Sequence, residues 1–366
     1  MASRTNSSFV LFSPQNVGFE DRPEPQISDP HEVLLRIKST GICGSDVHYY
    51  NHGRIGKYEV RSPMVLGHES AGVVIKVGPK VTTVKIGDQV ALEPGICCRY
   101  CVYCRKGIYN LCPKMQFAAT PPFDGTLCDV YCLPEDFCHK LPDTLSLDEG
   151  AMAEPLSVAV HVMLKQASVK FGDQVVVFGA GPIGLLCCAV ARAYGAGKIV
   201  AVDINEARLL FAKRYAATDV INATTTSKDA TEAAAMISKK AHVQTGGADI
   251  VVDASGVESS IRAGIHIVKP GGTFVQAGMG RDDVNFPIAA MCSKELHVKG
   301  SFRYGPGDYE CAIKLIETGK VDVASLITDI VPFEQAEDAF RGMSGGNSIK
   351  TVIRGPSMST KMPSQA

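Results

Sequence analysis

The stretch Gln174–Gly184 reads QVVVFGAGPIG, and it decides the fold of the second half of the chain. Val175–Phe178 is an uninterrupted apolar run, as expected for a strand of a parallel sheet that is covered on both faces. The six residues after it fit the pattern G-x-G-x-x-G, and a helix is predicted from Pro182 to about Tyr194. Glycines in this order permit a tight turn, a close approach of pyrophosphate to the backbone, and close packing of helix on strand. We therefore expect a doubly wound domain that binds a dinucleotide at the N-terminus of this helix.

Asp203 indicates which dinucleotide is bound. It ends the next expected strand, Lys198–Val202, and lies 19 residues beyond Gly184. An acid at this place accepts hydrogen bonds from the adenosine ribose and repels a 2′-phosphate, so NAD is favoured over NADP. Arg208 keeps NADP open as an alternative, because an arginine near this acid can bind the phosphate. A glycine-rich packing turn without a ligand is the other alternative, which the strand, helix and acid together disfavour.

The pattern of predicted strands and helices changes at about residue 157. Strands and helices alternate from there to residue 300, whereas the first 150 residues read as short strands separated by Gly, Pro and Asp. One helix (308–318) and one strand (348–353) follow, too little for a third domain, so we expect them to return to the first. The sequence thus predicts an α/β protein with a mainly-β domain and a Rossmann domain built on a doubly wound parallel sheet. The expected bounds are 1–156 with 300–355 for the mainly-β domain, 157–299 for the Rossmann domain, and 356–366 for a disordered tail.

Charge and composition narrow the classes of partner. The 366 residues include 37 basic and 38 acidic side chains, which gives no basic surface for nucleic acid or anionic lipid. The N-terminal MASRTNSS lacks the apolar core of a secretory signal, and the longest uncharged stretch, Val175–Ala191, is shorter than a membrane helix. We therefore expect no nucleic-acid partner, no membrane partner and a cytoplasmic location. Cysteines stay reduced there, so clusters among the 13 cysteines indicate metal sites rather than disulfides.

Four cysteines form the first candidate metal site. Cys98-x2-Cys101-x2-Cys104-x7-Cys112 places four thiols within 15 residues. Four thiolates satisfy tetrahedral zinc and leave no position for a substrate, so we interpret this site as structural zinc. An iron–sulfur cluster, a redox C-x-x-C pair and a disulfide remain alternatives.

Four residues that are distant in the sequence form the second candidate site: Cys43, His68, Glu69 and Glu154. A catalytic zinc needs three protein ligands and one open position. Spacing alone does not assemble these residues, and each has a simpler interpretation. A single cysteine is often only a small buried side chain, and Gly-His-Glu is often only a polar turn.

The motifs taken together resemble the zinc-containing medium-chain dehydrogenase/reductase family. The run Gly67–Val81 matches the zinc signature of that family, the cysteine spacing matches its structural zinc lobe, and the similarity extends from about Val33 to Ile353. Gly41–Tyr50 and Phe117–Pro122 narrow the resemblance to the polyol branch, which contains sorbitol and xylitol dehydrogenases. The fungal-type xylitol dehydrogenases are the most similar. The resemblance implies a GroES-like fold for the mainly-β domain.

The family resemblance also implies roles for individual residues. One catalytic zinc, one structural zinc and one NAD are implied per chain. Cys43 and His68 would bind the catalytic zinc, with Glu69 or Glu154 completing the site directly or through bound water. The other implied residues are Ser45 and His48 for proton relay, with Glu154 as a third catalytic residue; Gly179, Gly181, Ile183, Gly184, Asp203 and Arg208 for the cofactor; and Tyr50, Phe117, Glu154, Arg303 and Tyr304 for the substrate.

These roles imply reversible, NAD-dependent oxidation of xylitol to D-xylulose by a homo-oligomer, a tetramer by resemblance. The proton would leave the substrate through Ser45 towards His48. A sorbitol (L-iditol) or L-arabinitol dehydrogenase is the nearest alternative. A simple zinc alcohol dehydrogenase is disfavoured by Glu154, where such enzymes usually have a cysteine. A catalytically silent NAD-binding relative is disfavoured because Cys43, His68 and the relay residues are all present.

Overall fold

The computed structural model describes residues 5–244, 246–342 and 348–356. It divides the chain into two compact units, Met1–Glu154 with Val323–Ala366, and Pro155–Asp322. The sequence predicted a return to the first unit at residue 300, but residues 300–322 belong to the second unit. Within this segment, Oδ2 of Asp308 lies 2.8 Å from Nδ1 of His161, which belongs to the same unit. The predicted disordered tail lies outside the described residues except for Pro356.

The first unit is built on a seven-stranded, mostly antiparallel sheet. Its order is β12-β8-β7-β3-β20-β19, and β11 pairs with β3 in addition. Strand β20 pairs antiparallel with β3, so residues 352–354 lie beside residues 39–41. The strands are β3 (Glu32–Gly41), β7 (Glu69–Val77), β8 (Gln89–Leu92), β11 (Val130–Pro134), β12 (Cys138–Lys140), β19 (Ile327–Val331) and β20 (Lys350–Arg354).

Smaller elements complete the first unit. A three-stranded antiparallel sheet of order β2-β1-β6 packs its apolar side chains into the same core. The strands are β1 (Thr5–Ser13), β2 (Asn16–Pro23), β4 (Arg54–Ile55), β5 (Tyr58–Glu59), β6 (Met64–Val65), β9 (Gly95–Ile96) and β10 (Gln116–Phe117). The helices are α1 (Gly44–His52), α2 (Val102–Arg105), α3 (Leu147–Ala151), α11 (Ala336–Gly342), and the 3₁₀ turns Tyr109–Leu111, Glu135–Phe137, Ala324–Leu326 and Phe333–Gln335. Helix α4 (Ala153–Val160) begins at the end of this unit.

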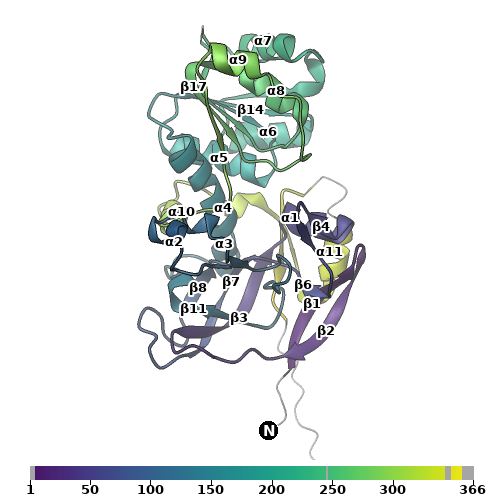
Figure 1. Cartoon of the computed structure of the whole chain (residues 1–366), viewed down its shortest axis with the longest axis vertical. Helices are drawn as coiled ribbons and strands as arrows, with labels where there is room; N and C mark the ends of the chain where they lie inside the picture. The colour runs from purple at the N-terminus through teal and green to yellow at the C-terminus, as the bar shows by residue number, and fades with distance from the viewer. Residues whose placement is uncertain (1–4, 245, 343–347, 357–366) are drawn as a thin grey trace, which may run out of the picture. The chain divides into compact units, whose positions relative to one another are not determined.

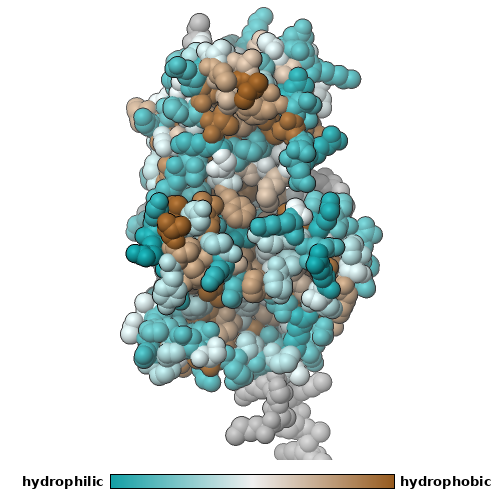
Figure 2. Space-filling view, in the orientation of Figure 1, coloured by the Kyte–Doolittle hydropathy of each residue, from teal (hydrophilic) through white to brown (hydrophobic). Residues whose placement is uncertain are grey.

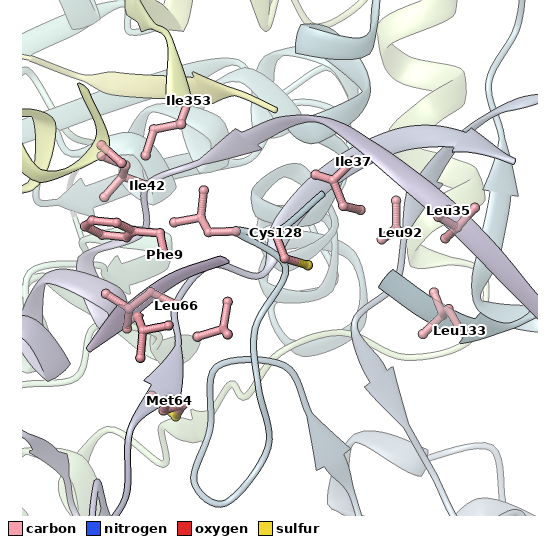
Figure 3. Packing of buried hydrophobic residues seen from close by; sticks show 14 of the residues in the cluster. Phe9, Leu35, Ile37, Ile42, Met64, Leu66, Leu92, Cys128, Leu133 and Ile353 are labelled. Atoms are coloured by element: carbon pink, nitrogen blue, oxygen red, sulfur yellow. The ribbon is translucent and has the colours of Figure 1, made fainter. Parts of the chain in front are cut away.

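Side chains that are far apart in the sequence share the core of the first unit (Figure 3). Phe9 of β1, Ile37 of β3 and Ile353 of β20 are each at most 1% exposed. The close view shows Ile42 and Phe9 beside Ile353, and Ile37 farther along, toward Leu92 and Leu35. Burial of such side chains stabilises the fold by about 1.5–3 kcal/mol each. The C-terminal strand is therefore an integral part of this unit.

The second unit is a six-stranded, wholly parallel sheet of order β15-β14-β13-β16-β17-β18. All five residues of β13 are buried, as the apolar run predicted. Strand order reverses on either side of β13, and ligands of doubly wound folds bind at such a switch point. The strands are β13 (Gln174–Phe178), β14 (Lys198–Asp203), β15 (Asp219–Asn222), β16 (Ala248–Asp253), β17 (Val268–Gln276) and β18 (His297–Gly300).

Helices cover the parallel sheet of the second unit (Figure 1). The α/β prediction is confirmed: a mainly-β unit and a doubly wound unit are both present. The helices are α5 (Pro182–Ala193), α6 (Glu206–Tyr215), α7 (Ala230–Lys240), α8 (Glu258–Ile267), α9 (Ile288–Ser293) and α10 (Asp308–Glu317), with a 3₁₀ turn at Ala223–Thr225 and a π-helical segment at His161–Gln166 that continues α4. Within the described residues, none of the helices combines the length and the apolarity that crossing a membrane requires.

Candidate zinc and dinucleotide sites

The fold brings together three of the four residues of the dispersed candidate site. One ligand atom from each of Cys43, His68 and Glu69 lies within 4.8 Å of the other two. Strand pairing explains this proximity, because β3 and β7 pair with Gly41 opposite Glu69. Cys43 follows β3 as the residue before α1, while His68 directly precedes β7 and Glu69 is its first residue. The pairing of β3 with β7 thus brings together residues that are 25 and 26 positions apart in the sequence, which spacing alone could not show.

The donor set of this cluster fits zinc. A thiolate, an imidazole and a carboxylate are the ligand types that zinc binds in proteins, and three protein ligands leave a position open for substrate. His68 and Glu69 are 7% and 1% exposed, so the ligands are held in a largely water-free environment. The geometry therefore fits a catalytic rather than a closed structural metal site.

Asp46 belongs to this cluster, although the sequence analysis missed it. Its Oδ1 lies 3.3 Å from Nδ1 of His68 and accepts a hydrogen bond from the backbone N–H of Gly67 at 3.0 Å. Oδ2 accepts a hydrogen bond from the backbone N–H of Cys43 at 3.3 Å. Burial lowers the pKa of His68, but the charges of Asp46 and Cys43 outweigh it and raise that pKa well above its usual value. A carboxylate behind a ligating histidine fixes the ring orientation and its tautomer.

Lys350 is the second residue that the sequence analysis missed. Its Nζ lies 2.8 and 2.5 Å from the two carboxylate oxygens of Glu69 and donates to the carbonyl oxygen of Ile42 at 3.0 Å. The side chain is 2% exposed. A Cβ built at Gly41 would overlap Oε2 of Glu69, so only glycine leaves room for this arrangement. The sequence signal was a lysine at the start of the short strand β20, two residues before the apolar pair Val352 and Ile353.

Glu154, the fourth predicted residue, lies outside the three-residue cluster. It is 5% exposed and lies in the first turn of α4. Burial lowers the pKa of Lys350, but the charges of Glu69, Cys43 and Glu154 outweigh it and raise that pKa. Glu154 is therefore near enough to act on the lysine that holds Glu69. Of the two carboxylates left open by the sequence, Glu69 is the one grouped with Cys43 and His68.

Helix α1 carries the two residues of the predicted proton relay. Oγ of Ser45 lies 3.4 Å from Nε2 of His68. His48 follows Ser45 by three residues, about one helical turn, and its side chain is exposed. Burial and the charges of His52 and Arg54 lower the pKa of His48. One end of the predicted relay thus contacts the metal cluster and the other reaches solvent.

Two predicted substrate residues lie in the first unit. The ring of Phe117 lies 5.7 Å from the ring of His68, which places this apolar side chain beside the metal cluster. Tyr50 packs on Phe340 with ring centroids 6.0 Å apart and is only 7% exposed. The structure therefore associates Phe117 with the metal cluster and Tyr50 with the hydrophobic core.

Arg303 and Tyr304, two further predicted substrate residues, lie in the second unit between β18 and α10. Arg303 has a φ of +56°, a left-handed conformation that side chains other than glycine rarely adopt. Its guanidinium carbon lies 4.7 Å from the centroid of the Phe302 ring. Tyr304 packs edge-on against Tyr309 at 5.0 Å. The substrate roles of Arg303 and Tyr304 stay predictions.

The four-cysteine lobe forms one compact cluster. Ligand atoms of Cys98, Cys101, Cys104 and Cys112 all lie within 4.8 Å of one another. Backbone N–H groups point at the sulfurs, as from Cys98 to Sγ of Cys112 at 3.4 Å, and N–H donors from Tyr100 and Cys101 lower the pKa of Cys98 to about 6. All thirteen cysteines lie in the described residues, and all are free thiols. The arrangement fits a closed tetrahedral zinc site rather than a disulfide.

The glycine-rich turn after β13 has the geometry that a dinucleotide needs. Gly179 has a φ of +92°, and a Cβ at Gly184 would overlap the carbonyl oxygen of Gly179. A Cβ at Gly181 would meet no atom within 4 Å, so the backbone is open to a ligand there. Asp203 lies beside this turn, since its Oδ2 accepts a hydrogen bond from the N–H of Ala180 at 2.6 Å. These residues fit a pyrophosphate at the start of α5 and a ribose at Asp203.

Ile183 and Arg208 lie in first turns of helices near this turn. Ile183 follows Pro182 at the start of α5 and is half-buried. Arg208 is in the first turn of α6, where its backbone N–H donates to the side chain of Asn205 at 3.1 Å. Their roles as cofactor contacts remain predictions.

Two family models match the chain, one in each of the two units. Residues 29–143 match the family model of the alcohol dehydrogenase GroES-like domain, and residues 182–318 match that of zinc-binding dehydrogenases. The chain is 59% identical over 350 residues to a probable D-xylulose reductase A of Aspergillus clavatus and to D-xylulose reductase A of Aspergillus oryzae, covering 96% of this chain and 97% of each relative. Among solved structures, L-idonate 5-dehydrogenase of Escherichia coli is similar with a TM-score of 0.87, 28% identity, and coverage of 96% and 99%.

Proposed function

Because the chain belongs to the family of zinc-binding dehydrogenases with an alcohol dehydrogenase GroES-like domain, we propose that it is an NAD-dependent polyol dehydrogenase. The reaction is xylitol + NAD⁺ to D-xylulose + NADH + H⁺, and it is reversible. The observation that carries the proposal is the cluster of Cys43, His68 and Glu69 in a chain that is 59% identical, over nearly its full length, to D-xylulose reductases.

Cys43, His68 and Glu69 are the residues that would hold the catalytic zinc. When bound there, zinc supplies a Lewis acid that lowers the pKa of a substrate hydroxyl. Asp46 holds the imidazole of His68 in place, and Lys350 holds the carboxylate of Glu69. Cys98, Cys101, Cys104 and Cys112 would hold a second, structural zinc.

The proton of the substrate hydroxyl leaves through α1. Ser45 lies against His68, so its hydroxyl can accept a proton and pass one on. His48 is one turn away and exposed, and burial and the charges of His52 and Arg54 lower its pKa, which favours the neutral imidazole. A neutral imidazole at the surface accepts the proton and releases it to water. Glu154 is the third catalytic residue that we assign. Its charge acts on Lys350, the lysine that contacts Glu69.

The second unit binds NAD. Gly179, Gly181 and Gly184 let the pyrophosphate approach the start of α5, where backbone N–H groups face it. Asp203 accepts the ribose hydroxyls and repels a 2′-phosphate. Ile183 and Arg208 complete the proposed cofactor contacts.

Substrate selection depends on pairing every hydroxyl of the polyol. Glu154 and Arg303 supply charged partners, and Tyr50, Phe117 and Tyr304 are the proposed remaining contacts. An alcohol without those hydroxyls would leave charged groups unpaired, which disfavours its binding. Polyols are thereby favoured over ethanol.

A panel of alcohols tests the function. Rates with xylitol, sorbitol, L-arabinitol, ribitol and ethanol are measured with NAD and with NADP. We expect the highest kcat/KM for xylitol with NAD. A higher value for sorbitol or L-arabinitol would make the protein the neighbouring polyol dehydrogenase, and a higher value for ethanol would overturn the polyol assignment.

We further propose that the protein is a homo-oligomer and, from its resemblance, a tetramer. Strand β18 is the last strand of its sheet, so one edge of its backbone is open to a partner. Apolar side chains beside it are exposed: Ile288 by 59%, Val298 by 39% and Phe302 by 40%. Hydrophobic surface gathers over α8 and α9 in Figure 2. Light scattering after size-exclusion chromatography gives the mass, and a monomer would contradict this proposal. The cytoplasmic location stays a prediction.

A further inference from the structure

Lys350 carries a buried positive charge among the acidic groups of the proposed zinc site. Its ammonium contacts both oxygens of Glu69, at 2.8 and 2.5 Å, and the charges of Cys43 and Glu154 also act on it. The lysine and Glu69 are at most 2% exposed. A buried lysine is costly unless it is paired, so this pairing is the condition for burying it.

The surroundings hold the lysine in place. Its Nζ also donates to the carbonyl oxygen of Ile42 at 3.0 Å, and β20 is paired with β3 next to that residue. Gly41 leaves no room for a side chain against the Glu69 carboxylate, so that carboxylate is confined between the backbone of Gly41 and the lysine. Lys350 is therefore a buried side chain that is fixed against Glu69 by three contacts of its ammonium group.

A zinc ion and this ammonium need the same carboxylate. Glu69 is one of the three residues whose ligand atoms cluster, and both of its oxygens already face Lys350. We propose that Lys350 is an internal counter-ion that competes with the catalytic metal for Glu69. This inference rests on the proposed zinc site at Cys43, His68 and Glu69.

Two consequences follow from such competition. Without metal, Lys350 neutralises the buried carboxylate, so the chain folds with its ligands already in place. With metal, Glu69 stays a weak and replaceable ligand, because part of its charge is engaged by the lysine. A weakly held third ligand keeps a coordination position accessible to the substrate, which a catalytic zinc requires.

The test is a substitution that removes the charge and keeps the length of the side chain, Lys350→Met. We expect zinc to be held more tightly, because Glu69 loses its competitor and a positive charge leaves the site. The chelator concentration that removes half of the catalytic zinc should rise about tenfold or more. The melting temperature of the zinc-free protein should fall, because Glu69 is left buried and unpaired. Zinc per chain is measured by elemental analysis after dialysis against graded chelator, and the Cys43→Ala variant identifies which zinc is catalytic.

Two variants serve as controls. Lys350→Arg keeps the charge and should retain zinc as the wild type does. Lys140→Met removes a lysine that pairs with Asp88 at 3.0 Å elsewhere in the first unit, and it should change neither zinc retention nor the effect of chelator. A gain in zinc retention that appears only in K350M supports the competition.

Different results would contradict the role of Lys350 and the proposed zinc site. If K350M loses zinc as easily as the wild type, or more easily, Lys350 is not a competitor. If wild-type protein holds no zinc that depends on Cys43, the proposed zinc site itself fails. Should K350M not fold, the K350M/E69Q double variant decides: recovery of the fold supports the pairing, and continued failure contradicts it.

Discussion

Oδ1 of Asp46 lies 3.3 Å from Nδ1 of His68, and both side chains are buried beside Cys43. Because this carboxylate holds the ring of a proposed zinc ligand, Asp46→Asn should weaken zinc binding by about 10- to 100-fold while the fold persists. Zinc content after dialysis against chelator measures the effect. Asp88→Asn is the matched control, since Asp88 pairs with Lys140 and belongs to neither metal cluster. Equal zinc retention in both variants would show that Asp46 does not support His68.

Gly41 provides a second test of the same cluster. A side chain at this position would overlap the carboxylate of Glu69, so Gly41→Ala should displace that carboxylate and reduce both zinc retention and turnover. Gly44→Ala is the control, because a Cβ at Gly44 meets nothing within 4 Å. The two substitutions lie three positions apart, and each adds one methyl group. If G41A retains zinc and activity as G44A does, the carboxylate of Glu69 does not lie against the backbone of Gly41.

Asp203 should control the choice of cofactor. Asp203→Ala removes the group that accepts the ribose hydroxyls and repels a 2′-phosphate, so kcat/KM for NAD should fall at least tenfold while that for NADP stays level or rises. Asp219→Ala, which removes a carboxylate paired with Lys198, should leave the ratio of the two values unchanged. An unchanged ratio in D203A would refute the assignment of Asp203.

The pH dependence of stability should report on Glu135. Burial would raise the pKa of its carboxyl, but hydrogen bonds from His31 and from the backbone of Thr82 and Thr83 lower it to about 2, from an ordinary 4.5. A folded-state pKa below the unfolded one contributes stability above pH 4.5, and that contribution is lost as the pH falls from 4.5 towards 2. The free energy of unfolding of wild type and Glu135→Gln should therefore differ at pH 6 and converge near pH 2. A difference that is independent of pH would contradict this.

Local sequence was sufficient for much of the fold and part of the site. QVVVFGAGPIG predicted the strand, the turn and the helix because glycine spacing and apolar runs act within a few residues. The four-cysteine cluster was predictable for the same reason, since all four thiols lie within 15 residues. The catalytic cluster was not, because Cys43 and His68 meet only through the pairing of β3 with β7.

Residues distant in the sequence account for what was missed. Lys350 is 281 positions from Glu69, and only the pairing of β20 with β3 brings them together. Asp46 lies three residues from Cys43, but an aspartate at the start of a helix also fits a simple capping role. The chain returns to the first unit at residue 323 instead of 300, and the contact of Asp308 with His161, 147 positions away, is one that no local pattern reveals.

We propose that a zinc held at Cys43, His68 and Glu69 supports oxidation of a polyol. The most direct measurement is zinc per chain and xylitol turnover with NAD, in the wild type and in Cys43→Ala. We predict two zinc ions in the wild type, and in the variant one zinc, retained by the four-cysteine lobe, together with loss of turnover. Two zinc ions in C43A, or turnover that survives the substitution, would contradict the account.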